Sequence, residues 1–228
     1  MKRHTEELEA LKKLCLQENM ELTPLQYELL AGYAVLLEQW NKKINLISRK
    51  EDAPVVVKHI FHSLLMGLFH PFGAGEKVLD LGTGGGLPGI PLAIAWPETR
   101  FLLVDSTGKK IAACQAMLKE LGISNAVAVH SRVEELKGLS FDTVLSRQVA
   151  QLEQLCAYAC RFLKPEGVLI CLKGGNLEEE IRTALDSRHI HHGFPASIEH
   201  FPISGFSPFF AEKEIVIARR QNNLPGND

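Results

Sequence analysis

The sequence has no long apolar segment. No stretch of the chain approaches the roughly 18 uninterrupted apolar residues that a membrane-spanning helix needs. The first 20 residues alternate charged residues with leucine and do not form the apolar core of a signal peptide. We therefore expect a soluble, cytoplasmic protein that has no membrane partner.

The sequence lacks a disulfide pattern. There are five cysteines, an odd number, and most lie within apolar helical or strand patterns, so we expect no disulfide bonds. Cys156 and Cys160 are one helical turn apart and could in principle bind a metal. No Cys-x-x-Cys pair or regular histidine spacing accompanies them, however, and core packing is the favoured interpretation. We therefore predict that the protein holds no metal.

An excess of positive charge is also missing. The chain has 25 Lys and Arg against 27 Asp and Glu, a formal net charge of -2. This charge excludes a uniformly basic surface for nucleic acid but permits a local basic patch. The sequence contains no internal repeat or low-complexity segment. With 46% hydrophobic residues it can bury a large core, which excludes disorder over most of its length.

Two kinds of pattern follow one another along the chain. Residues 5–19, 23–44 and 54–69 have apolar residues at helical spacing, and Thr23, Pro24 and Gln26 form an N-terminal capping signal. From residue 77 on, short apolar runs alternate with helical patterns, which is typical of a parallel sheet. The expected strands are 77–82, 100–105, 126–130, 141–146, 168–172, 197–203 and 213–219, and the expected helices between them are 88–96, 107–121, 151–162 and 177–187.

These patterns predict an α/β fold with a mostly parallel sheet and helices on both faces. We divide the chain into a helical N-terminal extension over 1–75, packed on the core, an α/β domain over 76–220, and a tail over 221–228 that we expect to be disordered. The run 163–167 is predicted to be a turn. The helix over 23–44 is predicted to be a lid or brace for the domain that follows it.

A glycine-rich loop follows the first strand of the α/β domain. Residues 80–89 read Asp-Leu-Gly-Thr-Gly-Gly-Gly-Leu-Pro-Gly, and Asp105 ends the next strand. Glycines permit positive φ angles and the close approach of a ligand, and Asp105 could accept hydrogen bonds from both hydroxyls of a ribose. Together these features predict a nucleotide-cofactor pocket. The alternative is a turn that binds nothing, with the aspartates acting as helix caps.

Two cofactors compete for this loop. The spacing Gly84-x-Gly86-x-x-Gly89 matches the dinucleotide fingerprint, in which a helix N-terminus receives a pyrophosphate. Asp80 favours the other cofactor, because a carboxylate at the strand end suits an ammonium and a sulfonium and would repel phosphates. Asp-x-Gly-x-Gly-x-Gly is also the first signature of S-adenosylmethionine methyltransferases with a Rossmann-like fold. We therefore favour a methyltransferase over an NAD-linked dehydrogenase.

The flanking sequence resembles one methyltransferase family. The matching motifs are Trp40-Asn41-Lys42-Lys43-Ile44-Asn45-Leu46, His59 with Ser63-Leu64, the run 82–92, Val104-Asp105-Ser106, Lys109-Lys110, and the run 141–150 with its Ser146-Arg147. From about residue 22 to residue 219 the chain is similar to the bacterial 16S ribosomal RNA guanine-N7 methyltransferases, also called glucose-inhibited division protein B. The resemblance implies a Rossmann-like S-adenosylmethionine-dependent methyltransferase domain over 76–220. It also implies methyl transfer to N7 of a guanine in the 16S ribosomal RNA of the small subunit.

The resemblance also implies site residues. The family's cofactor positions fall on Gly82, Leu87, Val133, Glu134 and Arg147, and the fold adds Gly84 and Asp105. Val133 and Glu134 would hold the adenine, although an acidic residue there also simply suits the dipole of a helix first turn. Arg147 would close over the cofactor or bind O6 of the guanine, or else form a structural ion pair with Asp142 or Asp105.

Three positions depart from the family pattern. His62 stands where the family has Asp, Ile47 where it has Thr, and Gln148 where it has Ala. These changes leave the cofactor loop intact and concern the side that would face the RNA.

No residue is predicted to be catalytic. Guanine N7 has a lone pair and no proton, so its attack on a methyl group needs alignment and removal of water instead of a general base. Ser146-Arg147 lacks the Asn/Asp-Pro-Pro-Tyr/Phe of amino-group methyltransferases, and no Pro-Cys pair offers the nucleophile of cytosine carbon methylation. His59 follows an apolar run on a helix and is interpreted as a core or capping histidine.

Basic residues gather locally despite the acidic total. We predict that RNA phosphates are bound by side chains from the basic run over 41–62 and by others near strand ends, namely Lys42, Lys43, Arg49, Lys109, Lys110 and Arg147. A solvated basic face is the alternative, and we expect a monomer. Three rival functions stay open: a methyltransferase for another RNA or a small molecule, an NAD-linked oxidoreductase, and a binding module without activity.

Overall fold

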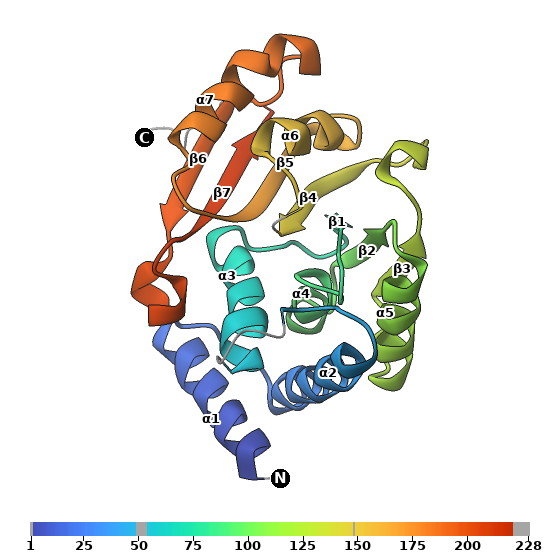
Figure 1. The fold of residues 1–228 in the computed structure, drawn as a ribbon, viewed down its shortest axis with the longest axis vertical. Coiled ribbons are helices and arrows are strands. Elements are labelled where there is room, and N and C mark those ends of the chain that lie inside the picture. Colours follow the sequence, from blue (N-terminus) through green and yellow to red (C-terminus); the bar gives the residue numbers. More distant parts are fainter. Residues whose placement is uncertain (1, 49–53, 148, 221–228) are drawn as a thin grey trace.

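The computed structural model describes residues 2–48, 54–147 and 149–220. One seven-stranded sheet lies between two layers of helices (Figure 1). Its strands are β1 (Lys77–Leu81), β2 (Arg100–Asp105), β3 (Ala126–His130), β4 (Phe141–Arg147), β5 (Leu163–Gly174), β6 (Ser197–Pro202) and β7 (Lys213–Arg219). The α-helices are α1 (Lys2–Gln17), α2 (Pro24–Lys43), α3 (His62–Phe69), α4 (Gly89–Ala95), α5 (Gly108–Glu120), α6 (Leu152–Ala159) and α7 (Glu178–Asp186).

The order of the strands creates a switch point beside β1. The sheet runs β3-β2-β1-β4-β5-β7-β6, and β7 is antiparallel to both of its neighbours while the remaining pairs are parallel. The chain therefore moves outward from β1 through β2 to β3 and then returns to the other side of β1 as β4. In open α/β sheets ligands bind beyond the carboxyl ends of the strands at this point. The expected mostly parallel sheet is confirmed.

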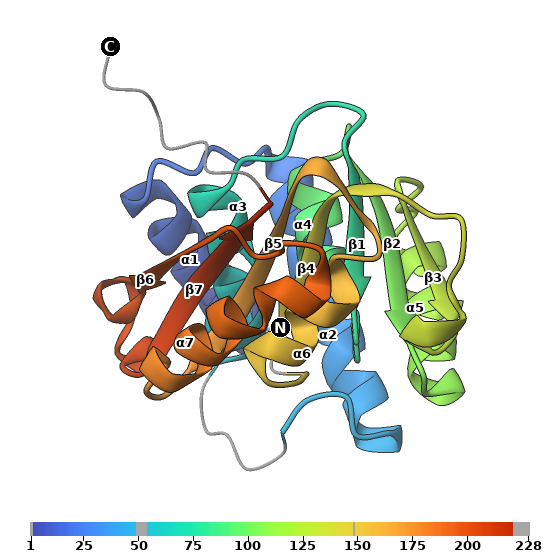
Figure 2. The ribbon, with the colours of Figure 1, turned by 90° about the horizontal axis from the view of Figure 1, so that it is seen from above.

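Alternate residues of each strand face opposite helical layers. Val78 and Leu103 belong to a hydrophobic cluster that contains buried residues of α1 to α5, whereas Leu79 and Val104 belong to a second cluster with α6 and Ala184 of α7. Because side chains alternate across a strand, apolar residues at every position bury both faces of the sheet. Figure 2 shows the two layers on either side of the strands and confirms the prediction of helices on both faces.

The start of α2 forms as the sequence predicts. Thr23 and Gln26 make a reciprocal capping box, and Pro24 occupies the first turn, where its missing N–H costs nothing. The amide of Gln26 also donates to the carbonyl oxygens of Ile94 and Ala95, at 3.0 and 2.9 Å, and so satisfies the C-terminal end of α4. The N-terminal helices therefore share one core with the sheet. The division of the chain at residue 75 stays a prediction.

One expected turn is a strand. β5 begins at Leu163 instead of near residue 168, and Leu163 pairs with Phe141 before the register shifts by Thr143. This irregularity accommodates Pro165 and Gly167, whose turn preference suggested a loop. The expected helix over 54–69 is also divided, because Val56–Phe61 is a π-helix that continues into α3. The tail 221–228 lies outside the described residues.

Three general features concern the class of protein. All five cysteines are free thiols. Over residues 2–48, 54–147 and 149–220, no three His, Cys, Asp or Glu side chains are grouped as a metal site would require. Over the same ranges, every helix is too short or too polar to cross a membrane.

Candidate active site

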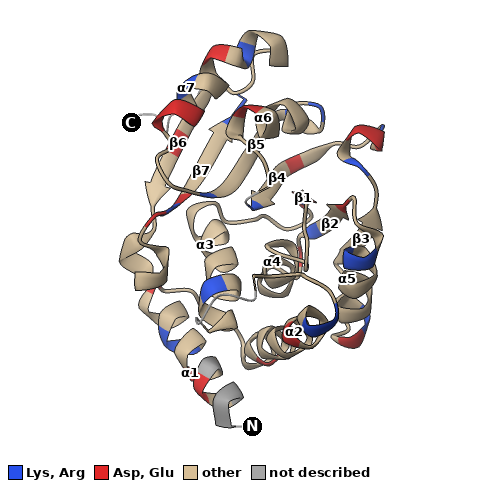
Figure 3. Cartoon of the chain, viewed as in Figure 1, with Lys and Arg blue, Asp and Glu red and all other residues tan. Residues whose placement is uncertain are grey.

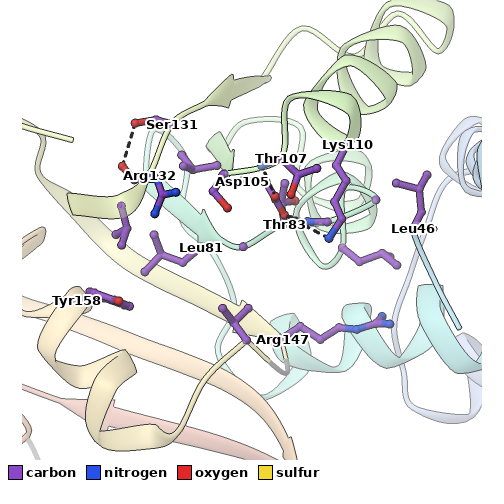
Figure 4. A pocket seen from close by; sticks show the side chains of 18 of the residues that line it. Leu46, Leu81, Thr83, Asp105, Thr107, Lys110, Ser131, Arg132, Arg147 and Tyr158 are labelled. Atoms are coloured by element: carbon purple, nitrogen blue, oxygen red, sulfur yellow. Dashed lines mark hydrogen bonds and ion pairs between the residues drawn. The ribbon is translucent and has the colours of Figure 1, made fainter. Parts of the chain in front are cut away.

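A cavity of about 580 Å³ lies at the switch point of the sheet. It is lined by the glycine loop after β1, the tip of β2, the segment after β3, the end of β4, and residues 46–48 after α2. Figure 4 shows side chains from these elements arranged around one hollow. The volume suits a nucleotide-sized ligand, since small-molecule sites occupy roughly 300 to 1,000 Å³.

Asp105 joins the tip of β2 to the glycine loop. Its Oδ2 accepts a hydrogen bond from the backbone N–H of Gly84 at 3.0 Å, and its Oδ1 accepts one from the N–H of Thr107 at 2.8 Å. Lys110 lies 4.0 Å from the same carboxylate. Each carboxylate oxygen has two acceptor positions, so both retain one for another donor. Asp105, Gly82, Gly84 and the buried Leu87 all line the cavity.

Asp80 has a different place from the one that its motif suggested. It is fully buried beneath the loop, where its Oδ2 accepts hydrogen bonds from the hydroxyl of Thr83 at 2.6 Å and the N–H of Gly89 at 2.9 Å. Asp80 does not line the cavity, and its hydrogen bonds are to the loop itself. Burial raises the pKa of its carboxyl to about 7, although Thr83 and Gly89 favour the charged form. Asp80 shapes the loop from inside.

The helix α2 braces the loop from outside. The fully buried Tyr33 donates its hydroxyl hydrogen to the carbonyl oxygen of Gly85 at 2.9 Å. At the end of the helix, Oδ1 of Asn41 accepts from the backbone N–H groups of Leu46 and Ile47, at 2.8 and 3.0 Å, and this places both residues on the cavity wall. The sequence predicted a lid or brace but not these contacts, because helical spacing does not say which core tyrosine meets the loop.

Val133 and Glu134 lie where β3 leads into a short 3-10 helix over Val133–Glu135, and both line the cavity. The hydroxyl of Tyr158 on α6 donates to the Glu134 carboxylate at 3.1 Å. The pKa of Glu134 is lowered by its own backbone N–H and then by this hydroxyl. Glu134 therefore lies in a helical turn and also lines the cavity, so the two interpretations of this residue are compatible. Tyr158 is a wall residue that no sequence motif marked.

Arg147 contacts a histidine. Its Nη2 donates to Nδ1 of His59 at 2.7 Å. The two aspartates named as alternative ion-pair partners have other contacts: Lys164 pairs with Asp142, and backbone N–H groups donate to Asp105. Both Arg147 and His59 line the cavity. Burial, followed by the charge of Arg147, lowers the pKa of His59 to about 3, so its ring is neutral and accepts this bond. His59 lies in the π-helix, a distortion that is frequent at functional sites.

Two of the three departures from the family pattern lie near this contact. Ile47 is buried at the cavity wall. His62 is 5% exposed and stacks on Phe210 with ring centroids 4.7 Å apart. Within the described residues, Nε2 of His62 has no hydrogen-bond partner. Gln148 lies outside the described residues.

The predicted RNA-binding residues fall in two places. Lys42 and Lys43 are exposed in the last turn of α2, and the ammonium of Lys43 lies 5.0 Å from the centroid of the Trp40 ring. Lys109 is exposed in the first turn of α5, next to Lys110, which lines the cavity. Figure 3 shows basic segments at the end of α2 and the start of α5. Arg49 lies outside the described residues.

Solved structures that share this architecture show which fold the chain has. The M. jannaschii TYW2 structure in complex with AdoMet matches with a TM-score of 0.59, covering 78% of each chain at 16% identity. A precorrin-6y C5,15-methyltransferase from Geobacter metallireducens matches with a TM-score of 0.54, covering 79% of this chain and 96% of that one at 16% identity. The fold is that of the Rossmann-like S-adenosylmethionine-dependent methyltransferases.

Sequence comparison identifies the family. The profile described as rRNA small subunit methyltransferase G (GidB) matches residues 26–204. A Chlorobium limicola protein named ribosomal RNA small subunit methyltransferase G is 89% identical over 220 residues, covering 96% of this chain and all of the relative. One of the same name from Chlorobium phaeobacteroides is 72% identical, covering 92% and 94%. The chain belongs to the rRNA small subunit methyltransferase G family, as the sequence motifs predicted.

Proposed function

We propose that this chain transfers a methyl group from S-adenosylmethionine to N7 of a guanine in 16S ribosomal RNA, in the cytoplasm and as a monomer. The observation that supports this best is the cavity of about 580 Å³ at the switch point, bounded by the glycine loop and Asp105. It occurs in a chain of an rRNA methyltransferase family.

The residues around the cavity fit this cofactor. Asp105 offers an acceptor position on each carboxylate oxygen for the ribose hydroxyls, and Gly82 and Gly84 leave room for close approach over the loop. Leu87 and Val133 supply apolar contacts, and Glu134 lies at the edge where an adenine amine would be held. When bound, S-adenosylmethionine supplies an electrophilic methyl group on its sulfonium. Arg147 completes the cofactor set and also borders the path of the guanine.

The proposed reaction needs alignment more than proton transfer. N7 of guanine carries no proton, so attack on the methyl group requires no general base. His59, the histidine nearest to Arg147, has a pKa of about 3 and is a weak base. Its hydrogen bond to Arg147 instead fixes the direction of the guanidinium, whose fork suits O6 of a guanine. We therefore assign Arg147 to binding and His59 to positioning.

We place the RNA along the basic rim of the cavity. Lys42 and Lys43 at the end of α2, with Lys109 at the start of α5, are exposed cations on elements that border the opening. Lys110 and Arg147 lie deeper, at the cavity wall, and Arg49 of the basic run is included from its position in the sequence. Such side chains neutralise phosphates and give binding that weakens with salt.

The test is methyl transfer from radiolabelled S-adenosylmethionine into small ribosomal subunits from cells that lack the endogenous enzyme. Mass mapping then identifies the modified nucleotide. A 7-methylguanine in 16S ribosomal RNA is the expected product. Cofactor binding without incorporation into these subunits would refute the proposed substrate, and incorporation at another atom would refute the proposed chemistry.

A further inference from the structure

A second cavity of about 590 Å³ lies beside the first, at the same edge of the sheet. It is bordered by the segment after β4, by α6, by the end of β5 and by the start of β7, and its residues include Val149, Gln151, Gln154, Lys173, Gly174 and Lys213. Val149 also lines the cofactor cavity, and among the described residues it is the one shared by both. The two cavities therefore meet at Val149.

Val149 is an exposed apolar side chain between two polar cavities. It is 46% exposed and lies over Gly82, where a Cβ atom would come within 2.6 Å of Val149 Cγ2. Any side chain at position 82 would push Val149 out of place. A ligand held over Gly82 in the first cavity would lie against this side chain, which also borders the second cavity.

The two lysines of the second cavity differ in their partners. Lys173 is buried, and its Nζ donates to the carbonyl oxygen of Ala150 at 2.9 Å and pairs with Glu180 at 2.6 Å. Lys173 therefore fixes the wall of the cavity. Lys213 lies opposite Gly174 in the sheet and is half-buried, and its ammonium has no carboxylate partner in the part of the chain that the structure describes. Lys213 can bind a ligand oxygen there.

Gln154 provides the complementary acceptor. Its Nε2 donates to the hydroxyl of Tyr158 at 2.9 Å, which orients the amide and leaves Oε1 for another donor. A guanine presents N–H donors on its Watson–Crick edge and the acceptors O6 and N7 on its Hoogsteen edge. An ammonium and an amide oxygen in one cavity match this combination.

We infer that the second cavity receives the acceptor guanosine of the RNA, turned out of its stack, with its Hoogsteen edge directed past Val149 toward the cofactor cavity. O6 has two lone pairs and accepts from both Arg147 and Lys213, and Oε1 of Gln154 accepts from the Watson–Crick edge. The inference rests on the proposed function and names the residues that receive its substrate. The volume holds one nucleotide, and enzymes that modify a base take it out of the stack.

The first test separates substrate binding from cofactor binding. Lys213→Met removes the ammonium but keeps the length of the side chain, and Lys119→Met makes the same change near the far end of α5. We expect Lys213→Met to raise the KM for small subunits about tenfold or more. Calorimetric affinity for S-adenosylhomocysteine and the urea unfolding midpoint should stay unchanged, and Lys213→Arg should recover most of the lost affinity. Lys119→Met should match the unchanged chain.

The second test locates the base directly. The full chain, saturated with S-adenosylhomocysteine, is irradiated with an RNA that carries 6-thioguanosine at the target position, and the cross-linked peptide is sequenced. We expect cross-links within residues 149–154 or at Lys213. Cross-links confined to other segments, or a normal KM in Lys213→Met, would overturn the inference while leaving the proposed function intact. Absence of methyl transfer by the unchanged chain would overturn both.

Discussion

Arg147 donates a hydrogen bond from its guanidinium to Nδ1 of His59 across 2.7 Å, and this contact joins the end of β4 to the π-helix. The two residues are far apart in the sequence, and both line the cofactor cavity. A buried histidine with a pKa of about 3 stays neutral at every pH at which the protein is expected to work. The acceptor for Arg147 is therefore permanent and does not act as a pH switch.

The first prediction concerns this positioning contact. His59→Leu removes the acceptor, whereas His59→Gln offers an amide oxygen in its place. Loss of a hydrogen bond to a charged group costs about 1.5 to 3 kcal/mol. We therefore expect His59→Leu to lower kcat for small-subunit methylation by about tenfold or more, and His59→Gln to restore part of the loss.

Unfolding measurements provide the control for this pair. His59 is buried, so both substitutions should lower the urea midpoint to a similar degree. If His59 had a purely structural role, the loss of activity in each variant would follow its loss of stability. Two variants of similar stability would then have similar activity. Equal activity of His59→Leu and His59→Gln would therefore contradict the positioning role.

The second prediction tests the glycine loop with a matched pair. Gly84 has φ +57° and Gly122, at the end of α5, has φ +67°, so alanine is strained by about 1 kcal/mol or more at either position. A Cβ at Gly84 meets nothing closer than 4.0 Å in the protein, and one at Gly122 meets nothing within 4 Å. We expect similar losses of stability but a loss of S-adenosylhomocysteine affinity in Gly84→Ala alone, as measured by calorimetry. Equal cofactor affinity in the two variants would exclude the loop as part of the cofactor site.

Local signals in the sequence located most of the fold. The capping residues Thr23 and Gln26 marked the start of α2, and apolar runs followed by glycine or aspartate marked the strands and their carboxyl ends. Because parallel strands end at one edge, the sequence also indicated that Gly84, Asp105 and Arg147 would border one cavity. Each of these signals comes from a short stretch of sequence, and the rule that ligands bind at the carboxyl ends of parallel strands holds for open α/β sheets in general.

Contacts between distant segments could not be predicted from the sequence. Nothing local distinguishes Tyr33 from other apolar residues of α2, yet it is the one that bonds to Gly85. The hydrogen bonds of Asp80 could not be predicted for the same reason, since its position at a strand end does not reveal that Thr83 and Gly89 donate to it. The second cavity depends on the pairing of β7 with β5, which no periodicity specifies.

The third prediction concerns acid stability. Burial, then the charges of Arg147 and Lys213, lowers the pKa of His62 from 6.5 to about 3 in the folded chain. Below pH 6.5 the unfolded chain binds a proton that the folded chain refuses, so stability is present above that pH and is lost as the pH falls toward 3. At about pH 5 the loss from this residue is roughly 2 kcal/mol.

His62→Phe keeps a ring against Phe210 and removes this titration. We expect the difference in unfolding free energy between about pH 8 and about pH 5, measured with urea, to shrink by roughly 2 kcal/mol in His62→Phe. His189→Phe, at an exposed position, is the matched control for the loss of one histidine. Asp80, whose pKa is raised to about 7, contributes in the opposite direction but is common to all three chains. The same acid sensitivity in His62→Phe as in the parent chain would exclude His62 as a cause.

The fourth prediction concerns the basic rim. Lys42→Glu with Lys43→Glu reverses two exposed charges in the last turn of α2, and Lys12→Glu with Lys13→Glu makes the same change on α1. Each phosphate contact contributes about 0.9 to the slope of log affinity against log salt on a duplex and about 0.7 on a single strand. We therefore expect the α2 variant to bind 16S ribosomal RNA more weakly and with a shallower salt slope in filter-binding titrations. Its affinity for S-adenosylhomocysteine should stay unchanged, because neither lysine lines the cofactor cavity. Equal losses in the two double variants would point to a general effect of net charge, and an unchanged slope in the α2 variant would remove Lys42 and Lys43 from the RNA-binding surface.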